Sequence, residues 1–91
     1  MKIMAVCGTG LGSSFMLEMN VKKVLKKLGI EAEVSHTDLA SVTEGYADFF
    51  IMSRDIAASA RVSNVISLAN IINLTEIEEK LTEAFKAKGI L

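Results

Sequence analysis

A single cysteine opens a short run rich in glycine and serine near the start of the chain, "AVCGTGLGSS". Backbone N–H groups beside glycines can turn inward toward an anion, and serine hydroxyls can donate as well. A helix starting near Ser14 would add unpaired N–H groups and its positive end. We therefore expect a cradle for a phosphate-sized dianion, whose field favours the thiolate of Cys7 and makes it a nucleophile. The cradle would comprise Gly8, Thr9, Gly10, Leu11, Gly12, Ser13 and Ser14.

Other chemistries that use glycine-rich loops or thiols fit these residues less well. A dinucleotide fingerprint needs glycine where Ser13 stands. A nucleotide P-loop ends in Gly-Lys-Ser/Thr, and no lysine lies between Lys2 and Lys22. A redox pair needs a second cysteine, and a metal site needs more ligands than one cysteine and one histidine. We therefore expect no metal here.

The nearest mechanistic parallel is the loop of cysteine phosphatases, in which five residues separate the cysteine from Arg-Ser. This chain keeps that spacing after Cys7, but Ser13-Ser14 stands in place of Arg-Ser. The phosphatase arginine stabilises the phosphoryl group during its transfer. Its absence predicts poor hydrolysis and favours a protein that holds a phosphoryl group and hands it on. The alternatives are a hydrolase related to low-molecular-weight phosphatases and a non-catalytic anion-binding module in which Cys7 only packs.

The elements that would position this loop alternate between strand and helix. Apolar runs predict strands at 2–6, 30–36, 47–53 and 64–70. Helical spacing predicts helices from Ser14 to Gly29 and from about 75 to Gly89, with a weakly helical segment ending at Arg61. "SVTE" at 41–44 and "TEIE" at 75–78 have the capping-box pattern, the first for a short helix. The alternation predicts an α/β fold, a small doubly wound four-stranded parallel sheet flanked by helices in a Rossmann-like three-layer arrangement.

Such a sheet binds its ligand beyond the carboxyl ends of the strands, and its first strand usually lies centrally. Cys7 stands at the end of the first predicted strand. Arg54 follows the third strand at the same edge and could supply positive charge, while His36 ends the second strand and could donate to the sulfur. The plainer interpretations are an exposed loop pair of Arg54 with Asp55 and a solvated strand end for His36.

Length and composition bound the class of protein. The 91 residues suffice for one domain, 1–91, and a hydrophobic fraction of 51% with 23% charged residues predicts a packed core. A net charge of −1 gives no basis for nucleic-acid binding. One cysteine fits a reducing cytosol, and we find neither a signal-peptide pattern nor a membrane-spanning run. We therefore expect a cytoplasmic protein without a nucleic-acid partner.

The stretch "MAVCGTGLGSS", followed by "FMLEM", resembles enzyme IIB of the bacterial phosphoenolpyruvate-dependent sugar phosphotransferase system. Within that family the match is to the ascorbate type, in the lactose/galactitol-like group, and it covers essentially the whole chain. The resemblance implies that Cys7 is the phosphorylated cysteine and that Gly8 to Ser14 form the phosphate-binding loop. It also implies a four-stranded parallel sheet, with a core like that of low-molecular-weight phosphatases, and no metal or organic cofactor.

The resemblance further implies partners. Cys7 would take a phosphoryl group from a phosphohistidine on the IIA component and pass it to a sugar or sugar acid, L-ascorbate for this type, bound in the membrane component IIC. Association with the membrane would occur only through IIC. A IIB of a galactitol- or pentitol-like system is the alternative, because IIC mostly selects the sugar. Met16 and Met19, beside Phe15, either pack against the fold or form a docking face for such a partner.

Overall fold

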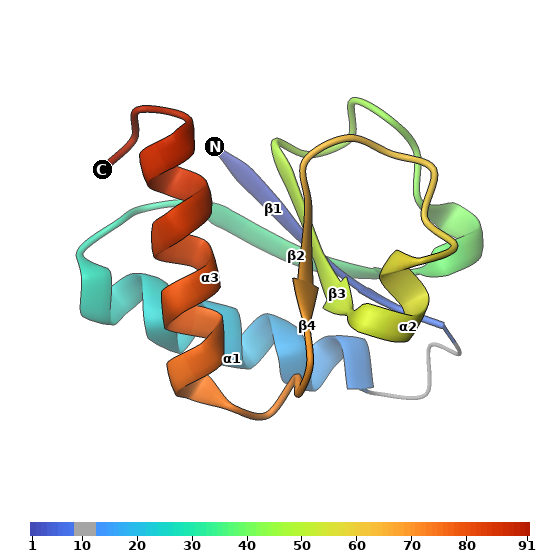
Figure 1. Ribbon diagram of the computed structural model, residues 1–91, viewed down its shortest axis with the longest axis horizontal. Coiled ribbons are helices and arrows are strands. Elements are labelled where there is room, and N and C mark those ends of the chain that lie inside the picture. Colours follow the sequence, from blue (N-terminus) through green and yellow to red (C-terminus); the bar gives the residue numbers. More distant parts are fainter. Residues whose placement is uncertain (9–12) are drawn as a thin grey trace.

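The chain forms a single parallel sheet with helices on both faces (Figure 1). The computed structural model describes residues 1–8 and 13–91. The strands lie in the order β2-β1-β3-β4 and all pair in parallel, which confirms the predicted doubly wound sheet with a central first strand. The elements are β1 (Lys2–Cys7), α1 (Ser13–Leu28), β2 (Glu33–Asp38), the 3-10 helix η1 (Leu39–Ser41), β3 (Phe49–Ser53), α2 (Arg54–Ala57), β4 (Val65–Leu68) and α3 (Leu74–Ala87).

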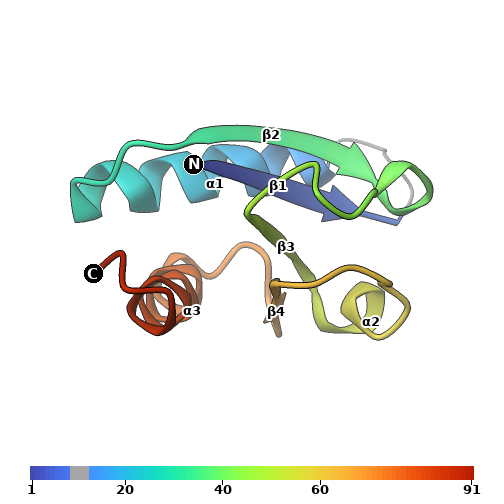
Figure 2. The same cartoon turned by 90° about the horizontal axis from the view of Figure 1, so that it is seen from above.

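Two apolar layers hold the helices against the sheet. On one face, strand residues such as Ile3 and Ile51 pack against α1 and α3, with Phe85 of α3 fully buried. On the other face, Phe50 and Met52 pack against α2 and the segments around it. Figure 2 shows α3 and α2 on opposite sides of the end of the sheet formed by β3 and β4. Because both faces of β3 are covered, its first four residues are all apolar, which produces the continuous run in the sequence.

The two long helices end where glycine predicts. Gly29 has φ 72° and Gly89 has φ 75°, in the left-handed region that favours glycine. At the end of α1, the Ile30 N–H donates to the Leu25 carbonyl at 3.0 Å and the Gly29 N–H to the Lys26 carbonyl at 3.2 Å. This pair of bonds is the Schellman motif, and the same pattern closes α3. In the part of the chain that the structure describes, we find no helix long and apolar enough to cross a bilayer.

The predicted short helix at "SVTE" is wrong. The helical turn in this region, η1, lies earlier, because the Asp38 carboxylate at the end of β2 caps it by accepting a hydrogen bond from the Ser41 N–H at 2.8 Å. Glu44 does not complete a capping box. Its carboxylate instead accepts from the Ser63 N–H at 2.7 Å and ties this loop to the segment before β4.

The helix predicted near "TEIE" is present, but its capping differs from the box. Helix α3 begins at Leu74, and Asn73 is its cap, with a side-chain oxygen 3.1 Å from the Glu76 N–H. Glu76 reaches past the cap and accepts from the N–H groups of Ala69 at 2.6 Å and Asn70 at 2.8 Å. That carboxylate therefore ties the helix to the end of β4.

Other boundaries also differ from expectation, and β3 begins at Phe49 rather than at residue 47. β2 begins at Glu33 rather than Ile30, β4 covers only Val65–Leu68, and the weakly helical segment is reduced to the single turn of α2.

Candidate functional site

Cys7 stands at the carboxyl end of the central strand. The preceding residue, Val6, pairs with Thr37 of β2 on one side and with Met52 of β3 on the other. The chain leaves β1 toward β2 and later crosses to β3, so the topological switch point lies between β1 and β3. Cys7 is partly exposed at this edge. The structure therefore places the cysteine where parallel α/β sheets bind their ligands.

The structure describes the cradle predicted after Cys7 at its two ends. Gly8 is exposed, and α1 begins at Ser13, one residue earlier than expected. Ser14 is buried within the first turn of α1 and is not its cap. Thr9, Gly10, Leu11 and Gly12 lie outside the described residues, as does the side chain of Ser13. What is defined is the geometry of the strand end and the start of the helix, whose first N–H groups have no partner within the helix.

Gly8 does not have the conformation that only glycine adopts readily. Its φ lies outside the left-handed region. A Cβ atom added there would lie 3.5 Å from Cδ1 of Ile56, an ordinary van der Waals contact. The residue after Cys7 therefore lies beside α2, and its backbone conformation does not require glycine.

Arg54 lies at the same edge of the sheet as Cys7. It is exposed and opens α2, directly after β3, two residues before the Ile56 that approaches Gly8. A hydrogen bond from the Ser53 side chain lowers the pKa of Asp55, and the positive charge of Arg54 adds to this effect. The two interpretations of Arg54 are compatible. It is exposed beside Asp55, and it places a positive charge at the edge of the sheet that carries Cys7.

His36 is exposed, as expected for a solvated side chain, but it also contacts α1. Its Nδ1 lies 2.8 Å from Oε1 of Glu18, while Nζ of Lys22 lies 3.2 Å from Oε2 of the same carboxylate. β2 also continues past His36 to Asp38. Glu18 was not among the predicted site residues. The available signal was its place in the helix, because it lies three residues before the buried Val21 and so within the stripe that faces the sheet.

The buried Glu18 carboxylate predicts a loss of stability in acid. Burial opposes its ionisation, but the hydrogen bonds from His36 and Lys22, with their charges, hold the pKa of Glu18 below its ordinary value of 4.5. When a carboxyl has a depressed pKa in the folded state, the unfolded chain binds more protons in acid. The contribution of Glu18 is therefore complete above pH 4.5 and is lost as the pH falls through its folded-state pKa.

We expect the midpoint of thermal unfolding to fall as the pH is lowered below 4.5. The variant Glu18→Gln should be less stable than the wild type at neutral pH and should lose less stability in acid. Melting curves followed by circular dichroism across this range measure both effects. Equal acid dependence in the two proteins would contradict the assignment to Glu18.

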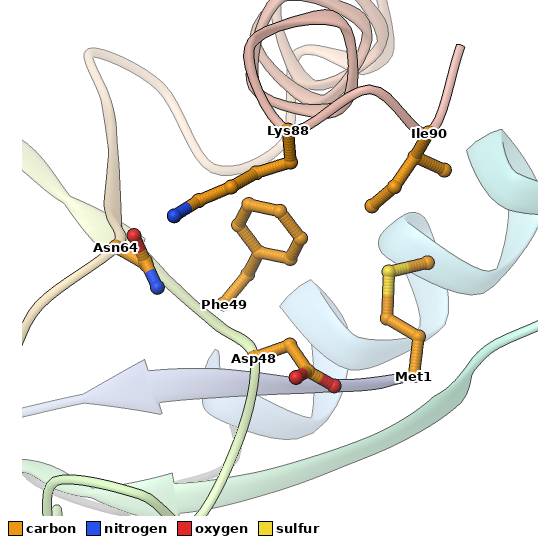
Figure 3. Close-up of a pocket in the computed structure, with 6 residues that line it drawn as sticks. All are labelled: Met1, Asp48, Phe49, Asn64, Lys88 and Ile90. Carbon is orange, nitrogen blue, oxygen red and sulfur yellow. The ribbon is translucent and has the colours of Figure 1, made fainter.

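A surface hollow of about 380 Å³ lies at the opposite edge of the sheet (Figure 3). Its lining residues precede β1, β3 and β4, begin β3 or follow α3, so it opens at the amino ends of the strands. Ligands of open parallel sheets bind at the carboxyl ends. The edge that carries Cys7 is therefore the candidate site. The hollow is lined by Met1, Asp48, Phe49, Asn64, Lys88 and Ile90.

The fold and the placement of Cys7 define a small α/β protein with a thiol at the switch point of its sheet. The chain belongs to the lactose/cellobiose-specific IIB subunit family of the phosphotransferase system (PTS), whose model matches residues 2–89. This finding confirms the resemblance drawn from the first loop.

Curated relatives agree with this family assignment. The chain is 27% identical over 86 residues to the ascorbate-specific PTS system EIIB component of Mycoplasma pneumoniae, covering 89% of this chain and 90% of the relative. It is 33% identical over 92 residues to the protein of the same description from Shigella boydii, covering 94% and 90%.

Among solved structures, the chain is similar to a low-molecular-weight protein tyrosine phosphatase from Bacillus subtilis. The TM-score is 0.59 at 16% identity, covering 98% of this chain and 99% of the other. At this identity the likeness shows the fold alone, and it confirms the predicted Rossmann-like core.

Proposed function

We propose that this chain carries phosphoryl groups through Cys7, between the IIA and IIC components of a sugar phosphotransferase system. Membership of the IIB family gives the chain a phosphotransferase role in general. The observation that carries the cysteine assignment is the position of Cys7, at the end of the central strand and beside the switch point. The domain would act in the cytoplasm as one unit, 1–91, and meet the membrane only through IIC.

The proposed reaction has two balanced steps. The Cys7 thiolate attacks the phosphorus of a phosphohistidine on IIA; the P–N bond breaks, an S–P bond forms, and the imidazole nitrogen takes up a proton. A hydroxyl of the bound sugar then attacks the same phosphorus. The S–P bond breaks, an O–P bond forms, the hydroxyl proton leaves to a base and the thiolate returns. Neither step needs a cofactor.

The protein would catalyse these steps chiefly by position and charge. The backbone N–H groups of residues 8–14, with the first turn of α1, would hold the phosphoryl oxygens during transfer. Arg54 would add positive charge from the neighbouring strand end, the accessory role that its place in α2 supports. Because the relatives are described as ascorbate-specific, we propose L-ascorbate as the acceptor, with a galactitol- or pentitol-like substrate as the alternative.

An exposed apolar surface beside the site supports a docking role. Phe15, Met16 and Met19 lie in the first two turns of α1 and are each 44–51% exposed, so they do not pack into the core. Methionine side chains adapt to more than one partner. IIA and IIC would therefore use this surface in turn, since each must bring its reacting group to Cys7.

The direct test is phosphate uptake. The protein is mixed with phosphoenolpyruvate, enzyme I, the phosphocarrier protein and an ascorbate-type IIA, and intact mass is measured. One added phosphate that maps to Cys7 supports the proposal. Absence of the adduct with a IIA shown to be active counts against it.

The protein should not hydrolyse a simple aryl phosphate at a rate comparable with that of a low-molecular-weight phosphatase. Ser13 stands at the position of the phosphatase arginine, so the charge that stabilises phosphoryl transfer to water is missing. Release of the coloured phenol measures turnover, with a low-molecular-weight tyrosine phosphatase as the positive control. Turnover that matches this control and disappears in Cys7→Ser would favour the hydrolase instead.

A further inference from the structure

A carboxylate is buried between α1 and β2 and is bound from two elements. The Glu18 side chain is only 10% exposed, and a buried carboxylate is stable only when its oxygens are partnered. Lys22 reaches it from the next turn of the same helix, and His36 reaches it from β2. Because an ionised carboxylate only accepts hydrogen bonds, Nδ1 of His36 carries the proton that is donated to Oε1.

The His36 ring makes a second contact with α1. Its centroid lies 5.7 Å from that of Phe15, with an interplanar angle of 87°, an edge-on arrangement. Phe15 follows Ser13 and Ser14 in the first turn of α1. One side chain of β2 therefore touches both the first turn of α1 and the second turn, which holds Glu18.

The sheet register places this link close to the cysteine. His36 pairs with Ala5, and two residues further along Asp38 pairs with Cys7. Val34 belongs to the core that packs against α1, and side chains two residues apart on a strand lie on the same face, so His36 lies on the face that α1 covers. The contact between His36 and α1 therefore lies level with Ala5, two residues before Cys7 at the end of β1.

We infer that His36 is a positioning residue for the phosphoryl transfer, and that its bond to Glu18 and its contact with Phe15 fix the first turn of α1 relative to Cys7. The inference rests on the proposed function, which assigns the N–H groups of that turn to the phosphoryl oxygens. Lys22 cannot do this, because it joins Glu18 within a single helix. Small displacements of such donors reduce the rate strongly while leaving partner binding nearly unchanged.

The test compares His36→Phe, which keeps a ring beside Phe15 but removes the donor, with Lys22→Met as the matched control. Lys22→Met removes the other partner of the same carboxylate and leaves the link to β2 intact. We measure single-turnover phosphate uptake at increasing concentrations of phosphorylated IIA, with thermal melts to establish that each variant is folded. His36→Phe should lower the maximal rate by roughly 10-fold or more, with a similar half-saturating concentration.

Two further results are expected. Lys22→Met should stay near the wild-type rate, and His36→Asn, whose side-chain amide replaces the Nδ1–H donor, should recover most of the rate lost in His36→Phe. A wild-type maximal rate in folded His36→Phe, or an equal loss in Lys22→Met, would overturn the inference. A pure stability effect would not produce this pattern.

Alkylation of Cys7 by iodoacetamide separates the inference from the proposed function, because it needs no partner protein. If His36 fixes the first turn of α1 relative to Cys7, His36→Phe should change the rate of alkylation relative to the wild type, and Lys22→Met should not. If the wild type takes up no phosphate but His36→Phe still changes the alkylation rate, the phosphocarrier proposal fails and the positioning role stands. Equal alkylation rates in all three proteins would refute the positioning role.

Discussion

Replacement of Cys7 by serine is expected to abolish phosphate uptake from phosphorylated IIA. A serine hydroxyl is close in size to the thiol, but it does not ionise near neutral pH without a base and is a much weaker nucleophile toward phosphorus. Cys7 is the only cysteine, so this one change removes all thiol chemistry from the chain. Intact mass should show one added phosphate on the wild type and none on Cys7→Ser.

The control must separate a lost acceptor from a lost fold or a different acceptor. Cys7 lies at a strand end and is only partly buried, so Cys7→Ser should keep the wild-type circular dichroism spectrum and melt cooperatively. His36 is the only histidine, and a histidine ring nitrogen is an alternative acceptor of phosphate. Phosphate retained by Cys7→Ser would place the acceptor elsewhere and contradict the proposal, and mapping the added phosphate to a peptide would identify that acceptor.

Phe85→Ala is expected to cause the largest loss of stability among single truncations of α3. Phe85 is fully buried, and its ring meets that of Phe49 edge-on, with the centroids 5.4 Å apart. Removal of a buried phenylalanine side chain costs about 3–5 kcal/mol, through lost burial and the cavity left behind. The free energy of unfolding of small domains is about 5–15 kcal/mol, so the variant should lose a large fraction of its stability.

Urea denaturation followed by circular dichroism measures this effect, with Tyr46→Ala as the matched control. Tyr46 is also aromatic but is 60% exposed, so its truncation should change the free energy of unfolding by less than about 0.5 kcal/mol. If the two variants unfold at the same urea concentration, the contact between α3 and β3 does not have the role assigned to it. A Phe85→Ala protein that is already unfolded without urea would mean that the loss of stability is larger than expected.

Local sequence signals predicted the elements well where one residue type decides the conformation. Gly29 and Gly89 end their helices in the left-handed conformation. The capping boxes failed because a residue outside each box caps the helix, Asp38 for η1 and Asn73 for α3. The glutamates of the two boxes bond elsewhere, Glu44 to the Ser63 N–H and Glu78 to the Lys27 ammonium. These partners are distant along the chain, so only the fold could select them.

The sequence by itself determined the order of strands and helices, the parallel sheet and the placement of Cys7 at the end of the first strand. These follow from apolar periodicity and from glycine, which act over a few residues. Only the tertiary structure decided that His36 meets Glu18 and Phe15, and that Ile56 lies beside Gly8. Those contacts depend on strand register and helix packing, because they join residues that are distant along the chain and become neighbours only when the sheet forms.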